Sequence, residues 1–347
     1  MRIKRDKYID DLKLRMGNGM IKVITGIRRC GKTYLLFELF GAYLRSLGVD
    51  EAHLIEIALD DDQFEALRDP RALSHHIRKR VADDDGQYYV LLDEVQYAMS
   101  SEELKDKDSP PRLYGVLNGL LHMRNVDVYV TGSNAKFLSK DIITEFRGRG
   151  DEVHMYPLTF AEFMSVYGGE KADGWRDYVL YGGLPLVLSF AAPDQKGDFL
   201  KSLFEETYLS DIIGRNNIRN KAELEELLNI LSSAIGSLTN PSKLSATFKS
   251  VKGKTISKTT IKRYIDYLED AFLIDSAIRY DIKGKKYIDT PSKYYFTDLG
   301  IRNAMLNFRQ VEETHAMENI IFNELKVRGY NVDVGVVVMN ETDKTGK

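Results

Sequence analysis

The stretch Gly26-Ile27-Arg28-Arg29-Cys30-Gly31-Lys32-Thr33 decides the fold, because it matches the pattern G-x-x-x-x-G-K-[ST] at every position. The apolar, β-rich run 21–25 precedes it, and residues 33–47 follow with apolar side chains at helical spacing along one side. A strand, a glycine-containing loop and a helix in this order are typical of a phosphate-binding loop. The alternative, a glycine turn at a helix start, does not require this flanking order.

Each residue type in the loop has a chemical reason. Glycines let the backbone curl so that its N–H groups face phosphate oxygens. Lys32 would lie beside the β- and γ-phosphates, and the Thr33 hydroxyl would be a Mg²⁺ ligand. Arg28 and Arg29 either steer the triphosphate or are solvated loop arginines, and Cys30 is interpreted as a small filler. The predicted nucleotide-binding residues are Gly26, Ile27, Arg28, Arg29, Cys30, Gly31, Lys32, Thr33 and Tyr34.

A second half of the site is expected at the end of the apolar strand 88–92, where Asp93 and Glu94 follow. Asp93 would hold Mg²⁺, mainly through water, because Mg²⁺ keeps much of its hydration shell. Glu94 would orient and deprotonate the attacking water. Acidic residues also end strands as simple caps, so the pairing with the upstream loop is what favours this interpretation.

Polar residues beyond the strand 126–130 are candidates for contact with the γ-phosphate, because this strand is expected to lie between the two motif strands, as an inserted strand does in such folds. The sequence there is Thr131-Gly132-Ser133-Asn134, and either Ser133 or Asn134 would be the sensor, unless the segment is an ordinary turn. Arg149, in Arg147-Gly148-Arg149, would stabilise transition-state charge in the same or a neighbouring subunit, with a surface arginine as the alternative. The predicted catalytic residues are Lys32, Glu94, Asn134 and Arg149.

Strands alternate with helices through residue 150, which predicts an α/β domain of three layers, a parallel sheet with helices on both sides. After Pro157 the chain is mostly helical, beginning with a helix expected at 158–167, and a final strand is expected at 331–339. The helical segments 223–235, 242–249 and 258–271 precede β-type runs near 274–280 and 294–297, the order of a winged helix. We expect a core at 1–156, a helical region at 157–220, a winged helix at 221–300 and a partial α/β region at 301–347.

These residues give the chain a resemblance to prokaryotic AAA+-type P-loop ATPases of uncharacterised function. The motifs that carry it extend over nearly the whole chain: Gly26–Thr33, Leu91–Gln96, Thr131–Asn134, Gly148-Arg149, Pro157–Phe163, Tyr178–Pro185, Lys293–Gly300 and Glu318-Asn319. The resemblance implies an AAA-like ATPase core, then a winged helix and the start of a restriction-endonuclease-like fold. It also implies ATP rather than GTP, and a homo-oligomer.

The same resemblance bears on the last region. The family continues beyond Glu318 with further acidic and polar strand residues, which would lie past Lys347. A two-metal site needs several ligands from separate elements, so nuclease chemistry is not expected of this chain. We expect a truncated gene product.

A local basic patch lies in the C-terminal half. Residues 243–293 contain twelve Lys and Arg and six Asp and Glu. The segment therefore has a formal net charge of +6, whereas the whole chain has a net charge of −3. Duplex DNA would meet Lys258, Lys262, Arg263, Lys283, Lys285 and Lys286. The alternatives are a protein-binding winged helix and a solvated lysine face.

Composition narrows the remaining choices. The 43% hydrophobic and 29% charged residues are globular values, and the single cysteine excludes an internal disulfide framework. No stretch has the length of a membrane span, no secretory signal is seen, and the histidines show no metal-ligand spacing, so we expect a cytoplasmic protein.

The sequence thus predicts a Mg²⁺-dependent ATPase whose hydrolysis moves a C-terminal winged helix that binds DNA. The alternative is a slow, nucleotide-gated switch that binds a protein partner. A small-molecule kinase is disfavoured, because no arginine-rich lid run is seen and Glu94 as a base favours water as the acceptor.

Overall fold

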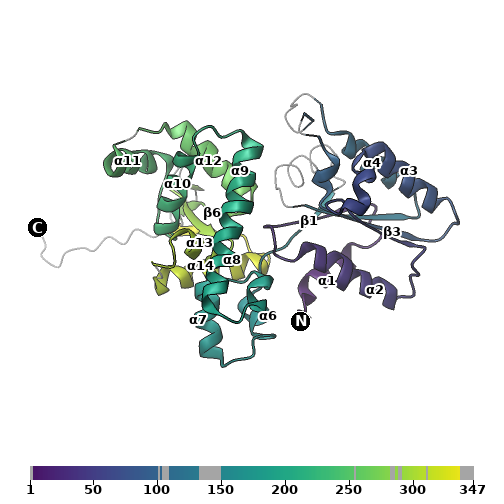
Figure 1. Cartoon of the computed structure of the whole chain (residues 1–347), viewed down its shortest axis with the longest axis horizontal. Helices are drawn as coiled ribbons and strands as arrows, with labels where there is room; N and C mark the ends of the chain where they lie inside the picture. The colour runs from purple at the N-terminus through teal and green to yellow at the C-terminus, as the bar shows by residue number, and fades with distance from the viewer. Residues whose placement is uncertain are drawn as a thin grey trace, which may run out of the picture. The chain divides into compact units, whose positions relative to one another are not determined.

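The structure is a computed structural model that describes residues 3–100, 102–103, 109–132, 150–253, 255–281, 286–287, 291–309 and 312–336. They form two compact units (Figure 1). Unit 1 comprises residues 1–174, 184–189 and 270–272, and unit 2 comprises residues 175–183, 190–269 and 273–347. The four-part division at residues 156, 220 and 300 stays a prediction.

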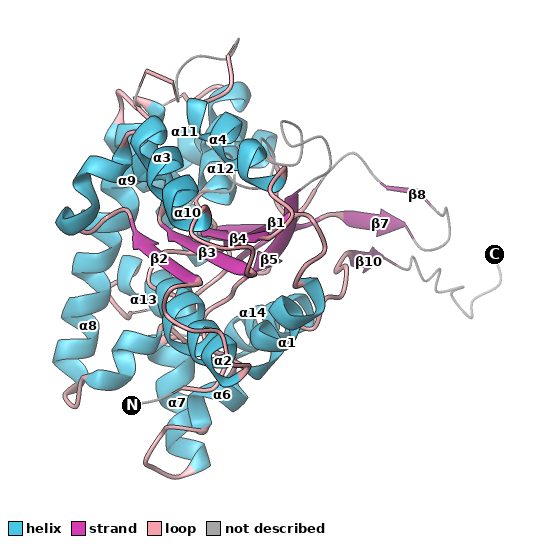
Figure 2. Ribbon diagram, turned by 90° about the vertical axis from the view of Figure 1, so that its right-hand side faces the viewer, coloured by secondary structure: helices cyan, strands magenta, loops and turns pink. Residues whose placement is uncertain are grey.

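Unit 1 is built on a sheet of five parallel strands in the order β2-β3-β4-β1-β5 (Figure 2). The strands are β1 (Ile21–Thr25), β2 (Leu54–Ala58), β3 (Tyr88–Asp93), β4 (Val126–Thr131) and β5 (Gly150–His154). β4 therefore lies between the strand of the phosphate loop and the strand of the two acids, as predicted. Parallel strands end at the same edge of a sheet, which brings Gly26, Asp93 and Thr131 to one edge.

Helices cover both faces of this sheet (Figure 1). On one face α3 (Pro70–Val81) and α4 (Arg112–Leu121) form a core with alternate residues of β1, β2, β3 and β4. On the other face lie α1 (Asp6–Arg15) and one helix made of the π-helical segment η1 (Tyr34–Phe40) and α2 (Gly41–Ser46). The Phe40 and Tyr129 ring centroids are 4.7 Å apart, which packs η1 against β4. This is the predicted three-layer α/β fold of a P-loop NTPase.

Short elements complete unit 1, and side-chain caps explain where two of the helices of this unit begin. They are η2 (Asp62–Arg68), η3 (Val95–Ala98), α6 (Phe160–Met164) and η5 (Pro185–Ser189). Asp69 caps α3 by accepting from the N–H groups of Arg71 and Ala72, with Pro70 at the first helical position. Thr159 and Glu162 form a capping box that starts α6.

A buried ion pair holds β1 beside β4. Lys22 is fully buried and its ammonium contacts the Asp127 carboxylate, which also accepts a 2.8 Å bond from the Tyr129 hydroxyl and a 2.9 Å bond from the Gly17 N–H. Burial lowers the pKa of Lys22, and the contact with Asp127 opposes that shift. The charges are thus satisfied within the sheet that positions the phosphate loop.

Unit 2 is mainly helical. Its helices, with α7 beginning in unit 1, are α7 (Lys171–Tyr181), a continuous α8 (Pro193–Ser202), η6 (Leu203–Leu209) and α9 (Ser210–Asn216), then α10 (Lys221–Ser233), α11 (Pro241–Lys252), α12 (Lys258–Asp270), α13 (Leu299–Met305) and α14 (Glu313–Val327). Its strands are β6 (Ile274–Ala277), β7 (Arg279–Asp281), β8 (Lys286–Tyr287), β9 (Lys293–Phe296) and β10 (Val334–Val336). β6 and β9 pair antiparallel after the three helices α10, α11 and α12, in the predicted order. Among the described residues, no helix combines the length and the apolar character needed to cross a bilayer.

Asp298 explains two of the motifs in unit 2. Its buried carboxylate accepts a 2.8 Å bond from the Gly183 N–H and a 3.0 Å bond from the Ile301 N–H at the start of α13. A Cβ at Gly182 would lie 2.3 Å from Asp298 Oδ1, so the glycine is required there. The Gly182-Gly183 motif and the Asp298 motif are therefore two halves of one packed junction.

Four segments differ from the sequence prediction. The strand expected at 331–339 begins only at Val334, and the helix expected at 158–167 is the shorter α6. β5 and α13 were not expected at all. Gly-Asp-Glu-Val-His, the sequence of β5, is polar because it is an edge strand, and its only buried residue is Val153.

Candidate functional site

The loop between β1 and η1 needs glycine at its first position. Gly26 has φ +139°, a conformation that L side chains rarely adopt, and a Cβ there would lie 2.1 Å from the Met155 carbonyl oxygen. Gly31 also has a positive φ, of +101°. The backbone therefore follows a path that only glycine permits, with the loop held against the residue that follows β5.

Lys32 is the buried cation of the loop, with 4% of its surface exposed. Its ammonium donates a 3.0 Å bond to the Gly26 carbonyl and a 3.1 Å bond to the Ile27 carbonyl. An ammonium has three N–H groups, so one more donor is available to a phosphate oxygen. Lys32 thus closes the loop on itself and places a positive charge at its centre.

The other predicted loop residues differ in exposure. Ile27 and Cys30 are fully buried. The Cys30 thiol donates a 3.6 Å hydrogen bond to the Met155 carbonyl oxygen. Burial raises the pKa of the Cys30 thiol, so the residue is held neutral. Arg29 is exposed with φ 64°, and Arg28 and Tyr34 are half-buried. The loop therefore combines a neutral, buried residue, Cys30, with two arginines, Arg28 and Arg29, that are at least partly exposed.

Asp93 lies between two threonine hydroxyls. Thr33 donates a 2.7 Å bond to Oδ2, and Thr131 donates a bond to Oδ1. Burial raises the pKa of Asp93 to about 6, and the bonds from Thr131 and Thr33 oppose this rise. The ionised form of this buried carboxylate is thus less stable than that of an exposed aspartate.

Magnesium fits this pair of residues. The Thr33 hydroxyl and the Asp93 carboxylate are hard oxygen ligands, and they approach each other from segments 60 residues apart in the sequence. Within the described residues no group of three or more His, Cys, Asp and Glu could hold a metal ion. A cation here would therefore take its remaining ligands from water and phosphate, which is the usual Mg²⁺ arrangement.

Glu94 is half-buried and has φ 50°, in the left-handed region that few residues other than glycine adopt. Its N–H donates a 3.0 Å bond to the Thr131 hydroxyl, and its carboxylate accepts from the Gln96 amide through Oε2. This turn sends the Glu94 backbone out of line with β3. The two acids of the strand end thus share the Thr131 hydroxyl, while Thr33 contacts only Asp93 and Gln96 contacts only Glu94 among them.

Some predicted residues cannot be placed. Ser133, Asn134 and Arg149 lie outside the described residues, as do Lys283, Lys285 and the side chain of Lys286. The structure brings together Lys32, Thr33, Asp93 and Glu94, and for the others the roles remain predictions.

The described part of the basic patch includes one face of α12. Lys258, Lys262 and Arg263 are exposed, whereas Ile261, Tyr264, Ile265 and Leu268 are buried on the opposite side of the helix. Lys243 and Lys249 of α11 are also exposed. The positive charges are therefore open to a polyanion.

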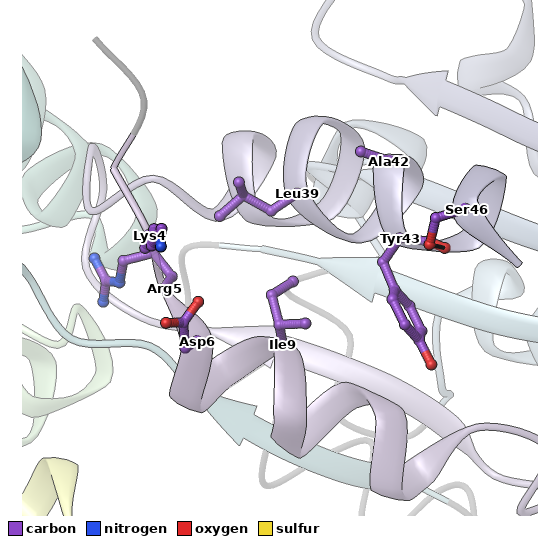
Figure 3. Close-up of a pocket in the computed structure, with 8 residues that line it drawn as sticks. All are labelled: Lys4, Arg5, Asp6, Ile9, Leu39, Ala42, Tyr43 and Ser46. Carbon is purple, nitrogen blue, oxygen red and sulfur yellow. Dashed lines mark hydrogen bonds between the residues drawn. The ribbon is translucent and has the colours of Figure 1, made fainter.

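A groove of about 640 Å³ lies between α1 and the η1–α2 helix (Figure 3). Ile9 and Leu39 line it from opposite helices, and Tyr43 closes one end. The Arg5 guanidinium points away from Ile9 and Leu39 in this view and donates a 2.6 Å bond to the Tyr156 carbonyl. The groove lining thus combines apolar side chains with the charged residues Lys4, Arg5 and Asp6 at one end, and none of the predicted site residues lines it.

Sequence reasoning missed two residues that hold the acids, Thr131 and Gln96. Both belong to motifs that it singled out, Thr131–Asn134 and Leu91–Gln96, but without a role. The position of Thr131 in the sequence was a signal that could have identified it. It directly follows the strand that was expected to lie between the two motif strands.

Comparison with known families divides the chain in two. The AAA domain family matches residues 18–164, and a family described as a domain of unknown function (DUF8612) matches residues 172–312. The first match contains the loop and both acids. The winged-helix and restriction-endonuclease-like interpretations of the C-terminal half stay predictions.

Two solved structures are similar at low identity. The Aeropyrum pernix ORC1 protein in complex with DNA is 13% identical, with a TM-score of 0.36 over 95% of each chain. Cdc6p from Pyrobaculum aerophilum is 12% identical, with a TM-score of 0.37 over 92% of this chain and 95% of that chain. At these TM-scores the two structures add nothing to the assignment.

Two relatives match over almost the full chain. An "Uncharacterized protein MJ1544" of Methanocaldococcus jannaschii is 26% identical over 344 residues, covering 94% of this chain and 71% of that protein. An "Uncharacterized protein" of Haemophilus influenzae is 32% identical over 346 residues, covering 98% of this chain and 83% of that protein. With the AAA domain match, this similarity shows that the chain belongs to the same family as the Haemophilus influenzae protein, a family of AAA-domain proteins.

Proposed function

We propose that the protein is a Mg²⁺-dependent ATPase with the triphosphate held by residues 26–33. One observation carries the proposal: the Thr33 hydroxyl lies 2.7 Å from Asp93, so the loop and the acidic strand end form one site. In this site Lys32 and the loop amides bind the phosphates. Thr33 and Asp93 hold Mg²⁺, which supplies charge neutralisation on the β- and γ-phosphates.

Glu94 is the proposed general base. It follows the Mg²⁺ ligand directly on β3, and its Oε1 is not the oxygen that Gln96 contacts, so one carboxylate oxygen remains for a water. Asn134 as the sensor and Arg149 as a charge-stabilising cation complete the proposed catalytic set. Both follow from their positions in the sequence beyond β4.

The test is phosphate release by the purified chain with MgATP, in parallel with EDTA. Lys32→Ala should abolish ATP binding, and Glu94→Gln should keep binding but lower kcat by about 10²- to 10⁴-fold. Glu38→Gln, an exposed glutamate on η1, is the matched control and should leave kcat unchanged. If Lys32→Ala binds and hydrolyses ATP as well as the parent chain, the site assignment is wrong.

We further propose that hydrolysis moves unit 2 and that duplex DNA binds the exposed face of α12. The support for coupling is the path of the chain, which leaves unit 2 after Gly183 and re-enters unit 1 at Leu184–Ser189. Pro185 in this segment lies beside the loop, 3.9 Å from a Cβ built at Gly31. The support for DNA is the exposed set Lys258, Lys262 and Arg263.

A slow nucleotide-gated switch is the second candidate, and the contact between Gln96 and Glu94 favours it. The Gln96 amide occupies one Glu94 carboxylate oxygen and leaves one oxygen, rather than two, for the attacking water. The two functions differ in turnover number and in gel filtration with and without ATP. Slow turnover with ATP-dependent assembly supports the switch, and DNA-stimulated turnover supports the ATPase motor.

A further inference from the structure

Thr131, the last residue of β4, joins the two acids through one hydroxyl. The residue is fully buried, and its Oγ1 contacts both Asp93 Oδ1 and the Glu94 N–H. A backbone N–H can only donate, so the hydroxyl accepts from Glu94 at 3.0 Å and its single hydrogen is directed to Asp93. The direction of both bonds is thereby fixed.

For Asp93, this bond removes rotational freedom. Thr33 already occupies Oδ2 at 2.7 Å, so Thr131 on Oδ1 leaves neither carboxylate oxygen free to turn about the side-chain bond. Only 1% of the Asp93 surface is exposed and the bond from Thr131 is buried, so bulk water does not compete with Thr131 for Oδ1. Thr131 therefore sets the direction in which the carboxylate faces the loop.

For Glu94, the bond stabilises an unfavourable backbone conformation. A non-glycine residue at φ 50° persists where its surroundings hold it, because the left-handed region costs free energy. The Glu94 carbonyl accepts a 3.0 Å bond from the Tyr97 N–H, and its N–H is held by Thr131. Together these contacts fix the Glu94 backbone, and with it the position from which the side chain extends.

We propose that Thr131 is a positioning residue for ATP hydrolysis, acting through Asp93 and Glu94 rather than by touching the nucleotide. The inference rests on the proposed ATPase function. It gives Thr131, at the end of β4, a role separate from the γ-phosphate contact that is predicted for Asn134. Loss of the hydroxyl would misplace both acids while leaving the phosphate loop intact.

The experiment compares Thr131→Val, which keeps the shape, with Thr131→Ser, which keeps the hydroxyl. We expect Thr131→Val to lower kcat by about 10- to 100-fold, because displacements near 1 Å at a reacting centre have effects of this size. The KM for MgATP should change less than about threefold, since Lys32 and the loop still bind the phosphates. Thr131→Ser should return kcat to within about threefold of the parent chain.

Two controls separate positioning from stability. Thr239→Val alters a buried threonine of unit 2 and should leave kcat unchanged. In a Glu94→Gln background, the addition of Thr131→Val should lower the single-turnover rate by less than about threefold. The effects of residues that act through one another are not additive. Melting temperatures of all variants report whether each one is folded.

The outcomes are distinguishable. Wild-type turnover no higher than that of Lys32→Ala overturns the proposed ATPase function and this inference with it. Wild-type turnover with an equally active Thr131→Val overturns the inference alone. A loss in Thr131→Val that Thr131→Ser does not restore shows that the hydroxyl is not the cause and also overturns it.

Discussion

Thr33, at the start of the helix after the phosphate loop, donates a 2.7 Å hydrogen bond to Asp93 at the end of β3. The contact joins the two halves of the proposed site. Its donor and acceptor are the groups that would share Mg²⁺. Burial of the Asp93 carboxylate destabilises its charged form, and the size of this effect can be measured.

Asp93→Asn is expected to stabilise the metal-free protein at neutral pH. The pKa of Asp93 is raised to about 6 from 3.8, so the folded state binds this proton more tightly than the unfolded state. The resulting stability is fully present below about pH 4 and is lost as the pH rises through 6, a difference of about 3 kcal/mol at about 1.4 kcal/mol per pKa unit. Asparagine stays neutral and avoids this loss.

Urea denaturation in EDTA at pH 7.5 and at pH 4 measures the effect. The advantage of Asp93→Asn over the parent chain should be largest at pH 7.5 and shrink at pH 4. Asp85→Asn, an exposed residue of the same unit, reports the general effect of removing one carboxylate. An Asp93→Asn variant that is less stable than the parent chain at both pH values contradicts the prediction.

Gly26→Ala should unfold or distort the loop. The added Cβ would lie 2.1 Å from the Met155 carbonyl oxygen at a φ of +139°, and backbone cannot move aside as a flexible side chain can. We expect a decrease of at least about 2 kcal/mol in the free energy of unfolding, together with loss of ATP binding. Thermal melting and nucleotide titration check the two effects.

Gly115→Ala is the matched control for that exchange. Gly115 is an exposed residue within α4 and a Cβ there meets nothing within 4 Å, so alanine should stabilise the helix by about 0.5–1 kcal/mol. Equal effects of the two exchanges would show that glycine is not required at Gly26.

Asp298→Ala should destabilise unit 2 by about 2–4 kcal/mol. It removes the helix cap of α13 and leaves the Gly183 N–H without this acceptor, and each of these changes costs on the order of 1–2 kcal/mol. Asp298→Asn keeps one acceptor oxygen and should show a smaller destabilisation. Chemical denaturation of both variants tests the order, and an Asp298→Ala variant as stable as the parent chain would exclude the junction as a structural element.

Sequence alone predicted the phosphate loop and the acidic strand end because both are local patterns. The position of β4 between β1 and β3 also followed from the class of fold. The double contact of Thr131 and the contact between Gln96 and Glu94 could not be predicted, because they depend on the left-handed turn at Glu94.

The C-terminal motifs illustrate the same limit. Glu318 was considered as an incomplete metal site, yet it accepts a 2.6 Å bond from the Lys293 ammonium and a 2.7 Å bond from the Tyr295 hydroxyl. Burial raises the pKa of Glu318, but these two bonds outweigh it and the pKa lies below its usual range. Pairings between β9 and α14 come from tertiary packing, which no local pattern encodes.

Exchange of Lys258, Lys262 and Arg263 for alanine should weaken DNA binding by the same factor for every sequence tested. The three side chains are exposed on one face of α12, where they would meet phosphates rather than base edges. For each side chain that binds a phosphate, its removal should reduce the slope of log affinity against log salt concentration by about 0.9. Fluorescence anisotropy with a labelled duplex at several salt concentrations gives this slope.

Lys171→Ala, an exposed lysine at the start of α7, is the control and should leave the slope unchanged. ATP binding should also be unchanged in the triple variant, because Lys258, Lys262 and Arg263 belong to unit 2 and the loop belongs to unit 1. An unchanged slope in the triple variant would mean that the face of α12 does not contact DNA. The basic patch would then be a solvated lysine face or a protein-binding surface, the two alternatives to DNA binding.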